Sequence, residues 1–281
     1  MFKNELRNTI KLVATDIDGT LLNDAREMGD FTREVIEKLI AKGICFVPST
    51  SRPYKELPPV LLDTSIRYYV CLNGAVIWDK VNDQVLKSHI LSGNTAREII
   101  KLTKPFEKAT TVVVNGTIFS DKKILPLFEK IGGSQLVNRT METRTLLDSV
   151  DELIEGLDSV DKLHFNFADA DSTKACRQVV PNFPDIFVTA STAYNIEITN
   201  VLATKGKMVG ELAKLIKLEP SLIMAFGDND NDISLFKNSG YKVAMANGIE
   251  SLKAIADEVT PYTNNDDGEA RFLNDFFALG L

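Results

Sequence analysis

One short segment near the start of the chain places two carboxylates directly after an apolar run. Residues 9–15 are β-branched and apolar, which predicts a buried strand, and Asp16 and Asp18 follow before Gly19 and Thr20. Ligands of an open α/β sheet bind at the carboxyl ends of its strands, where Asp16 would lie. Alternate residues of an extended segment point in the same direction, so the side chains of Asp16 and Asp18 would lie close together. Two negatively charged carboxylates at such a short distance repel each other unless a cation is bound to them. Taken alone, however, Asp-Gly is also an ordinary turn.

A second apolar segment, residues 46–48, ends in hydroxyl groups and an arginine. The hydroxyl of Thr50 can donate a hydrogen bond to a phosphate oxygen, and Ser51 and Arg52 follow it. Backbone N–H groups and a following helix N-terminus would complement the charge of that anion. The alternative is a hydroxyl-rich turn that only caps the helix beyond Pro53.

Lys205 precedes a segment whose apolar residues recur at helical spacing. These residues are Met208, Val209, Leu212, Leu215 and Ile216. A lysine at a helix start can reach back with its ammonium group across a neighbouring site. Lys205 is therefore a candidate phosphate-binding residue, although most lysines are solvated surface charges.

The apolar residues 222–226 lead into a cluster of three acids and two amides. The cluster spans residues 228–232, with Asp228 and Asp232 four positions apart. Hard oxygen ligands of this kind suit Mg²⁺. A calcium loop does not fit, because its sixth-position glycine and terminal glutamate are absent. The remaining alternative is a group of acids that caps the following helix.

With these segments in view, the chain resembles the haloacid dehalogenase superfamily, specifically its Cof-type branch of cytosolic sugar-phosphate phosphatases. The motifs that carry the resemblance are Asp16-x-Asp18-Gly19-Thr20, Thr50-Ser51-Arg52, Asn73-Gly74-Ala75, Lys205-Gly206 and Gly227-Asp228-x-x-Asn231-Asp232. Their order and approximate spacing match the family over nearly the whole length, and residues 264–270 are similar to its closing segment. The resemblance implies an α/β fold, in which a Rossmann-like parallel-sheet core domain carries an inserted α/β cap domain.

The resemblance also implies a role for each motif residue. Asp16 would be the nucleophile that forms an aspartyl phosphate, and Asp18 would protonate the leaving group and then activate water. Mg²⁺ would be held by the Asp16 carboxylate, the Asp18 backbone carbonyl and Asp228. Asp232 would orient Lys205 or a metal-bound water without binding the metal. The phosphate-binding residues would be Ile17, Thr50, Ser51, Lys205 and Asn231.

Two positions depart from the family pattern. Ser51 stands where such chains usually carry Gly, so the phosphate loop has to accept a Cβ atom. Residues 245–248 read Met-Ala-Asn-Gly instead of Met-Gly-Asn-Ala. Because the Asn is kept, we expect this exchange to be harmless.

The candidate site residues lie on both sides of a middle stretch whose order of strands and helices differs from that of the first third. The first third alternates strands and helices, which is typical of a parallel sheet covered by helices. The middle begins with an Asn-Gly hairpin signal and continues as mixed strands and helices. We therefore predict a discontinuous catalytic core of residues 1–90 and 192–281, with residues 91–191 as a cap that selects the substrate. Asn115 and Ser191 are candidate substrate contacts in the cap.

The composition of the chain limits the classes of partner that it can bind. The 281 residues carry a net charge of −7 without a basic run, which argues against nucleic acid and for a small phosphorylated metabolite. The three cysteines form no CxxC pair and are typical of free thiols in a reducing compartment. Residues 1–8 lack the apolar region of a signal peptide, and no stretch approaches the roughly 18 apolar residues of a membrane span. We expect a cytoplasmic protein without a membrane partner; the sequence sets no oligomeric state.

These expectations combine into a Mg²⁺-dependent phosphoric monoester hydrolase that acts on small metabolites, with sugar phosphates as the substrates. A phosphomutase of the related phosphomannomutase type remains an alternative, because the active-site residues barely distinguish the two. A regulatory protein that binds phosphorylated metabolites without turnover is a second alternative. The intact acids at Asp16 and Asp18 count against it.

Overall fold

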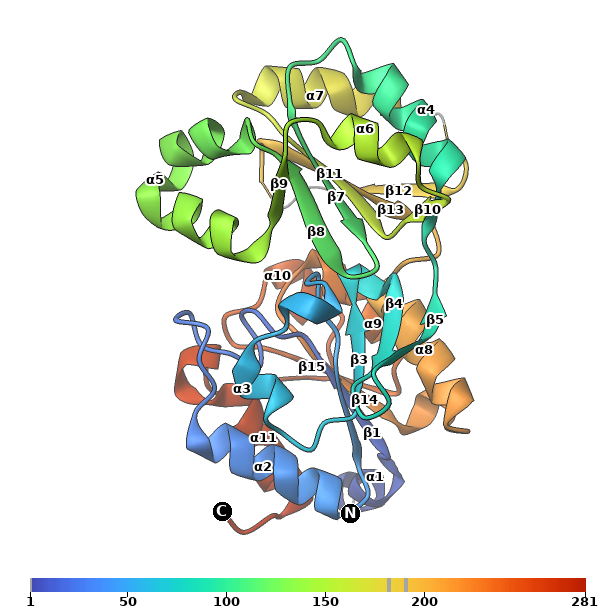
Figure 1. Cartoon of the computed structure of the whole chain (residues 1–281). Coiled ribbons are helices and arrows are strands. Elements are labelled where there is room, and N and C mark those ends of the chain that lie inside the picture. Colours follow the sequence, from blue (N-terminus) through green and yellow to red (C-terminus); the bar gives the residue numbers. More distant parts are fainter. Residues whose placement is uncertain (1, 181–182, 190–191) are drawn as a thin grey trace. The chain divides into compact units, whose positions relative to one another are not determined.

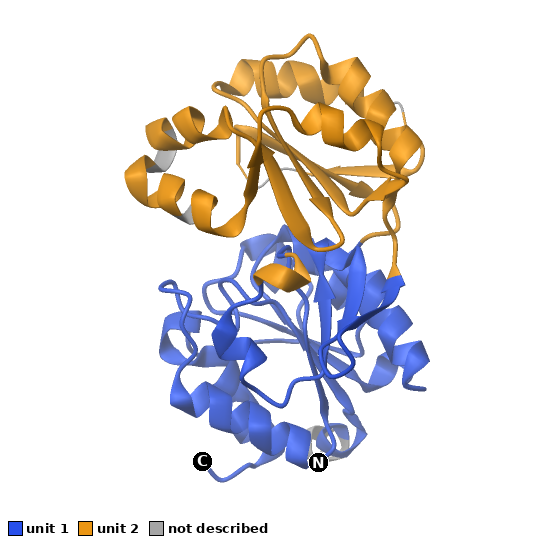
Figure 2. Cartoon of the chain, viewed as in Figure 1, with its two compact units in different colours: residues 1–52, 57–87, 204–281 blue, residues 53–56, 88–203 orange. Residues whose placement is uncertain are grey.

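The computed structural model describes residues 2–180, 183–189 and 192–281, and it divides into two compact units (Figure 2). Unit 1 consists of Met1–Arg52, Leu57–Lys87 and Thr204–Leu281. Unit 2 consists of Pro53–Glu56 and Ser88–Ala203. Within the residues searched, no helix combines the length and the apolar character that a membrane crossing requires.

Unit 1 is built on a five-stranded sheet in the order β16-β15-β14-β1-β2, and every neighbouring pair is parallel (Figure 1). The strands are β1 (Leu12–Thr15), β2 (Cys45–Pro48), β14 (Ile223–Gly227), β15 (Tyr241–Ala244) and β16 (Glu258–Val259). β1 and β14 are buried along their whole length, which explains their continuous apolar sequence. This arrangement confirms the predicted parallel-sheet α/β core.

Helices cover both faces of this sheet. The helices of unit 1 are α1 (Phe2–Thr9), α2 (Asp30–Ala41), α3 (Pro59–Leu62), α8 (Lys205–Leu215), α9 (Ile233–Lys237), α10 (Glu250–Lys253) and α11 (Gly268–Phe277). Buried residues of α8 and α9 form one core cluster with Leu12, Ala14 and Ala225. On the other face, Phe272 of α11 packs edge-on against Phe226 of β14, with ring centroids 5.6 Å apart. Successive residues of β1 therefore face α8 and α11 in turn.

The start of the chain differs from the prediction. We expected a strand from residue 9 to 15, but α1 ends at Thr9 and β1 begins only at Leu12. Arg7 Nε donates a hydrogen bond to the carbonyl of Phe276 at 2.5 Å, which ties α1 to the end of α11. This contact between distant parts of the chain stabilises a short helix that the local apolar pattern does not indicate.

A small sheet adjoins the core. It consists of β3 (Tyr68–Cys71), β4 (Val76–Asp79) and β5 (Gln84–Ser88), and an isolated parallel bridge joins Ser49, just after β2, to Val70 of β3. The turn η2 (Leu72–Gly74) links β3 to β4 through three residues with positive φ. This turn matters for the site described below.

Unit 2 contains a six-stranded sheet in the order β12-β13-β11-β7-β8-β9. Its strands are β7 (Ala109–Val114), β8 (Thr117–Asp121), β9 (Thr145–Leu147), β11 (Lys162–Asn166), β12 (Ile186–Thr189) and β13 (Asn195–Asn200), and a separate pair joins β6 (Leu91–Ser92) to β10 (Ser159–Val160). β13 pairs with β11 and β12, so residues 192–203 lie in unit 2 although the sequence placed them in the core. Asn115 occupies the β7–β8 turn with φ 49°, and Ser191 lies outside the described residues.

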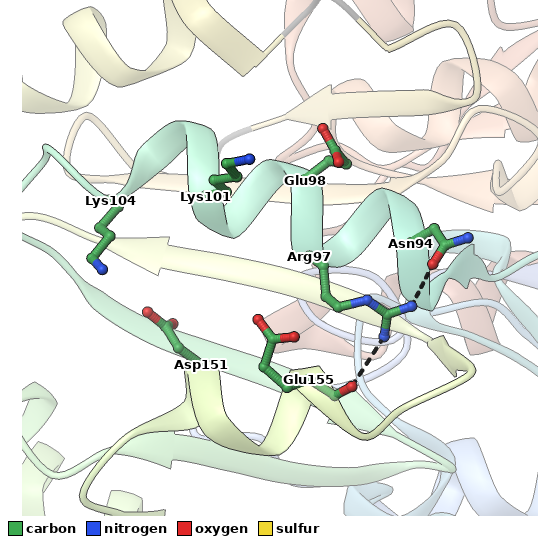
Figure 3. Close-up of a pocket in the computed structure, with 7 residues that line it drawn as sticks. All are labelled: Asn94, Arg97, Glu98, Lys101, Lys104, Asp151 and Glu155. Carbon is green, nitrogen blue, oxygen red and sulfur yellow. Dashed lines mark hydrogen bonds between the residues drawn. The ribbon is translucent and has the colours of Figure 1, made fainter.

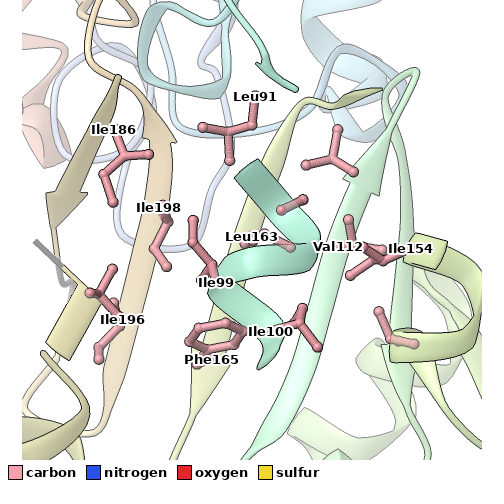
Figure 4. Packing of buried hydrophobic residues seen from close by; sticks show 14 of the residues in the cluster. Leu91, Ile99, Ile100, Val112, Ile154, Leu163, Phe165, Ile186, Ile196 and Ile198 are labelled. Atoms are coloured by element: carbon pink, nitrogen blue, oxygen red, sulfur yellow. The ribbon is translucent and has the colours of Figure 1, made fainter. Parts of the chain in front are cut away.

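One face of the unit 2 sheet forms an apolar core. The helices are α4 (Gly93–Thr103), α5 (Ile124–Thr143), α6 (Val150–Glu155) and α7 (Ala170–Val179). Ile99 and Ile100 of α4 and Ile154 of α6 gather around Leu163 and Phe165 of β11 (Figure 4), and Cys176 of α7 belongs to the same cluster. The alternate residues Lys162, His164 and Asn166 point to the opposite face, where Ala109 of β7 packs against Ile124 and Phe128 of α5.

Candidate active site

Three acids and one lysine of unit 1 meet at the carboxyl ends of β1 and β14. Asp16 follows β1, Asp228 follows β14, Asp232 ends the turn η5 (Asp230–Asp232), and Lys205 is the first residue of α8. One carboxylate oxygen of each acid lies within 4.8 Å of those of the other two. Lys205 Nζ lies 2.6 Å from Asp16 Oδ1 and 2.7 Å from Asp232 Oδ1. The structure thus joins residues that the sequence separates by 189 positions.

Two glycines allow these elements to approach one another. Gly19 has φ +87°, and a Cβ atom there would lie 2.6 Å from Asp228 Oδ2. Gly74 of η2 has φ +97°, and its Cβ would lie 2.2 Å from the carbonyl oxygen of Thr204, the residue that caps α8. Both positions therefore require glycine for two reasons, conformation and space. A substitution at Gly74 would push η2 away from the start of α8.

The cluster holds more negative than positive charge in a buried setting. Lys205 is completely buried, and Asp16 is 7% exposed. Burial raises the pKa of Asp16 despite the opposing effect of Lys205, and burial together with Asp232 raises the pKa of Asp228 to about 6. Burial disfavours the charge on Lys205, but Asp16 and Asp232 outweigh it and raise the lysine pKa above its usual value. Burial is thus the main cause of the raised carboxyl pKa values, and the single positive charge of Lys205 offsets it only in part.

The donor set fits Mg²⁺, with Asp16 and Asp228 as the available ligands. Hard carboxylate oxygens at this spacing are the chemistry that Mg²⁺ prefers. Asp232 already accepts from Lys205 through Oδ1, and its Oδ2 accepts from the backbone N–H groups of Asp228 at 3.0 Å and Asn229 at 3.1 Å. These contacts suit Asp232 to a supporting position rather than to direct coordination.

Asp18 makes an ion pair that the sequence did not predict. Arg52 Nε donates to Asp18 Oδ2 at 2.8 Å, and Arg52 Nη2 donates to Asp18 Oδ1 at 2.6 Å. The guanidinium side chain is 16% exposed and the carboxylate 41% exposed. This two-pronged geometry is the strong form of an arginine–carboxylate pair. Arg52, in the loop after β2, thus holds both oxygens of the Asp18 side chain.

The predicted phosphate loop has a geometry that accepts Ser51. Thr50 is buried, and its Oγ1 accepts a hydrogen bond from the Arg52 backbone N–H at 3.2 Å, so the hydroxyl proton remains for another acceptor. Ser51 is absent from the described residues with positive φ. Its backbone therefore has no need of the glycine that the family pattern carries.

The remaining predicted residues surround the same strand ends. Ile17 is buried, so only its backbone could meet a ligand, and its carbonyl accepts from the Leu22 N–H at 2.9 Å. Asn231 Nδ2 donates to Asn73 Oδ1 at 3.2 Å. Asn73 lies in η2, whose motif the sequence singled out without assigning it a role. Asn73 and Arg52 are therefore the contacts that sequence reasoning missed, although both lie inside recognised motifs.

A cavity of about 510 Å³ lies elsewhere, between α4 and α6 of unit 2 (Figure 3). Its charged lining balances three cations against three acids: Arg97, Lys101, Lys104, Glu98, Asp151 and Glu155. Arg97 is already bound, because its Nη1 donates to the carbonyl of Leu157 at 2.9 Å and its Nη2 to Asn94 Oδ1 at 2.5 Å. This balanced lining contrasts with the acid-rich cluster of unit 1 and offers no charge preference for an anion or a cation.

Comparison with known proteins identifies relatives that span the chain. The family model described as haloacid dehalogenase-like hydrolase matches residues 13–273. The Bacillus subtilis 5-amino-6-(5-phospho-D-ribitylamino)uracil phosphatase YitU is 28% identical and aligns over 95% of this chain and 98% of its own length. Phosphatase YwpJ of Bacillus subtilis is 25% identical over 94% of this chain and 99% of its own. Among solved structures, the phosphatase BT1666 of Bacteroides thetaiotaomicron has a TM-score of 0.80 at 25% identity, covering 95% of both chains.

Proposed function

This chain belongs to the haloacid dehalogenase-like hydrolases, and we propose that it is a Mg²⁺-dependent phosphatase of small phosphorylated metabolites. The acid-rich cluster around the buried Lys205 carries the proposal, because three close carboxylates at strand ends call for a cation and for an anionic ligand bound to it. The relatives named phosphatases support the same chemistry. Free cysteines at the three described positions support a reducing compartment such as the cytoplasm.

Asp16 is the nucleophile in this proposal. One of its carboxylate oxygens attacks phosphorus, the bond from phosphorus to the substrate oxygen breaks, and an aspartyl phosphate results. Lys205 holds Asp16 at 2.6 Å and would bind a phosphate oxygen beside it. Thr50, Ser51, Asn231 and the backbone at Ile17 supply further donors. Fixed donors of this kind stabilise the charge that develops on the transferring group.

Asp18 is the general acid and then the general base in this proposal. It gives a proton to the departing substrate oxygen, and it then takes one from the water that attacks the aspartyl phosphate and releases inorganic phosphate. Both Asp18 oxygens accept hydrogen bonds from Arg52, so the side chain has to leave the guanidinium before it can donate a proton. We propose that the arriving phosphate competes for Arg52 and so frees Asp18. An arginine fork suits either partner.

Mg²⁺ would be bound by the Asp16 and Asp228 carboxylates and by the Asp18 backbone carbonyl. The ion supplies charge neutralisation between the anionic nucleophile and the phosphate. Asp232 keeps Lys205 and the backbone of Asp228 in place. Thr20 Oγ1 donates to Asp228 Oδ1 at 3.0 Å and so orients that carboxylate.

For the substrate, we propose phosphate esters of sugars or sugar alcohols, selected by unit 2 acting as the cap. The relative YitU is named for a phospho-ribityl compound, which is a sugar-alcohol phosphate. On the face of the unit 2 sheet opposite its apolar core, β11 places His164 and Asn166, and ligands rich in hydroxyl groups need mixed donors and acceptors of this type. Residues 192–203 belong to this selecting unit in the proposal.

The test measures phosphate release from p-nitrophenyl phosphate and a panel of sugar and sugar-alcohol phosphates, with and without Mg²⁺. Asp16→Asn keeps the shape of the nucleophile and removes its charge, and Asp148→Asn is the matched control, since the Asp148 side chain is 91% exposed. We expect release that requires Mg²⁺, is lost in Asp16→Asn and is kept in Asp148→Asn. Isomer interconversion with little free phosphate would instead indicate a mutase. Binding of sugar phosphates without any turnover would overturn the phosphatase proposal.

A further inference from the structure

A fourth carboxyl group, outside the acid cluster, lies buried beside the end of β1. Glu269 is in the first turn of α11 and only 2% exposed. Its Oε2 lies 2.7 Å from Oγ1 of Thr15, the last residue of β1. Its Oε1 has no hydrogen-bond partner among the described residues. A buried carboxyl group with a single polar partner requires an explanation.

The Thr15 hydroxyl has two neighbours and only one proton. Its Oγ1 lies 2.9 Å from the backbone carbonyl oxygen of Asp16 and 2.7 Å from Glu269 Oε2. The Asp16 carbonyl oxygen can only accept, and so can an ionised Glu269, so the single Thr15 proton satisfies both contacts only if Glu269 carries a proton of its own and Thr15 donates to the carbonyl. The contact with Glu269 is then a hydrogen bond only if Glu269 donates, which requires the carboxylic acid form.

The surroundings of Glu269 favour that neutral form. Burial is the largest influence and raises the pKa of Glu269 to about 8; the contact with Thr15 opposes this rise, and the nearby charge of Asp16 adds to it by a smaller amount. The N-terminus of α11 favours a carboxylate, but this effect is smaller than the cost of burying an ion without a partner. The unpaired Oε1 is tolerable on a neutral acid and costly on an anion.

We propose that Glu269, as a neutral acid, is a positioning residue for the nucleophile, acting through the chain from Glu269 O–H to Thr15 Oγ1 and from the Thr15 O–H to the Asp16 carbonyl. The inference rests on the proposed function, in which Asp16 attacks phosphorus. Glu269 touches neither substrate nor metal in this arrangement. It acts through Thr15 alone.

The hydrogen-bond chain fixes a residue that the sheet holds only in part. Asp16 lies one position beyond β1, and its backbone N–H still donates to the carbonyl of Phe226 at 3.2 Å. With its carbonyl held by Thr15, both backbone polar groups of Asp16 are fixed, and with them the direction of its side chain. A nucleophile displaced by about 1 Å can lose about 100-fold in rate, so this restraint acts on kcat.

The test compares Glu269→Leu, Thr15→Val and Glu269→Gln with the unchanged full chain, using p-nitrophenyl phosphate at saturating Mg²⁺. Leucine and valine remove the donors at similar volume, and the glutamine amide can still donate to Thr15. We expect Leu and Val to lower kcat at least ~10-fold with KM within ~2-fold, and Gln to stay within ~3-fold of the unchanged chain. Leu273→Ala, a buried change on the same helix, is the control: it should lower Tm and keep kcat within ~2-fold.

A second readout does not need activity. Infrared difference spectra between the unchanged chain and Glu269→Gln at pH 7 should show the carbonyl stretch of a neutral carboxylic acid. A carboxylate signal there overturns the inference, as does a Gln variant as slow as the Leu variant, or Leu and Val variants with undiminished kcat. Absence of phosphate release from the unchanged chain, by contrast, overturns the proposed function and the positioning role that rests on it.

Discussion

Both units bury a lysine against a carboxylate, but only one of these lysines faces an excess of acid. In unit 2, Lys162 Nζ lies 2.5 Å from Glu197 Oε2, and the two side chains are 9% and 11% exposed. In unit 1, Lys205 is shared between Asp16 and Asp232, and Asp228 adds a third carboxylate. The unit 2 pair is balanced, and the unit 1 cluster is not. A buried ion pair alone is therefore weak evidence for a functional site. An excess of buried negative charge, by contrast, indicates a site that binds a cation.

Removing the positive charge of Lys205 in unit 1 should have the largest effect on turnover. We expect Lys205→Met to lower kcat for phosphate release at least ~10³-fold, because it removes the proposed phosphate contact and the positive charge that Asp16 and Asp232 share. The double variant Lys162→Met/Glu197→Leu, which replaces the balanced pair by apolar side chains, is the matched control and should keep turnover of p-nitrophenyl phosphate. Equal losses in both proteins would break the distinction between the two clusters.

Breaking the balanced pair on one side should cost stability instead. Glu197→Gln leaves the buried Lys162 without its carboxylate, so we expect a loss of ~3 kcal/mol in the unfolding free energy of unit 2, while the double variant stays close to the unchanged chain. Trp78, the single tryptophan, lies in unit 1, so its fluorescence follows that unit during urea unfolding, and circular dichroism follows both. If the urea midpoint shifts in circular dichroism and not in Trp78 fluorescence, the loss of stability is confined to unit 2, as we expect. Identical shifts would mean that the units unfold together.

Added Mg²⁺ should stabilise unit 1 selectively. A ligand at 100 times its Kd stabilises the folded state by about 2.7 kcal/mol, so the urea midpoint of Trp78 fluorescence should rise with Mg²⁺. Asp228→Asn removes one of the two carboxylate ligands and should abolish most of that rise. A Mg²⁺ response that survives Asp228→Asn would place the metal elsewhere.

The last expected effect is a pH dependence of stability from Glu269. Its pKa rises from 4.5 to about 8 on folding, so between these values the folded chain keeps a proton that the unfolded chain has released. Stability from this group is therefore complete below pH 4.5 and declines as the pH rises toward 8. Glu269→Gln has no such group, so its Tm relative to the unchanged chain should increase by ~2 °C or more between pH 5 and pH 8. A constant difference would contradict a neutral buried Glu269.

The local sequence pattern was sufficient to predict the parallel-sheet core and the positions of the motif residues at its strand ends. Asp16 and Asp228 follow apolar runs directly, and a run that ends in acids is visible without knowledge of tertiary contacts. The parallel-sheet core and the family membership are confirmed. The catalytic, phosphate-binding and metal-binding roles of these residues stay predictions.

Contacts between distant segments were not predictable in this way. Arg52 meets Asp18 across 34 positions, Asn231 meets Asn73 across 158, and Thr15 meets Glu269 across 254. Each pair depends on how helices and turns pack on the sheet, and no spacing rule links its members. For the same reason, the pairing of β13 with β11 and β12 could not be predicted from local pattern.

The pairing of β1 with β14 has a consequence for the nascent chain. Leu12 lies opposite Ile223, a separation of 211 residues, because all of unit 2 is inserted between the two strands. At a translation rate of about 5–20 residues per second, β1 waits about 10–40 s on the ribosome before its partner is made. Over that interval one edge of β1 is open to wrong partners, and long-range parallel pairing is slow to begin with. The yield of active protein in the cell therefore depends on how well this waiting strand is protected until β14 emerges.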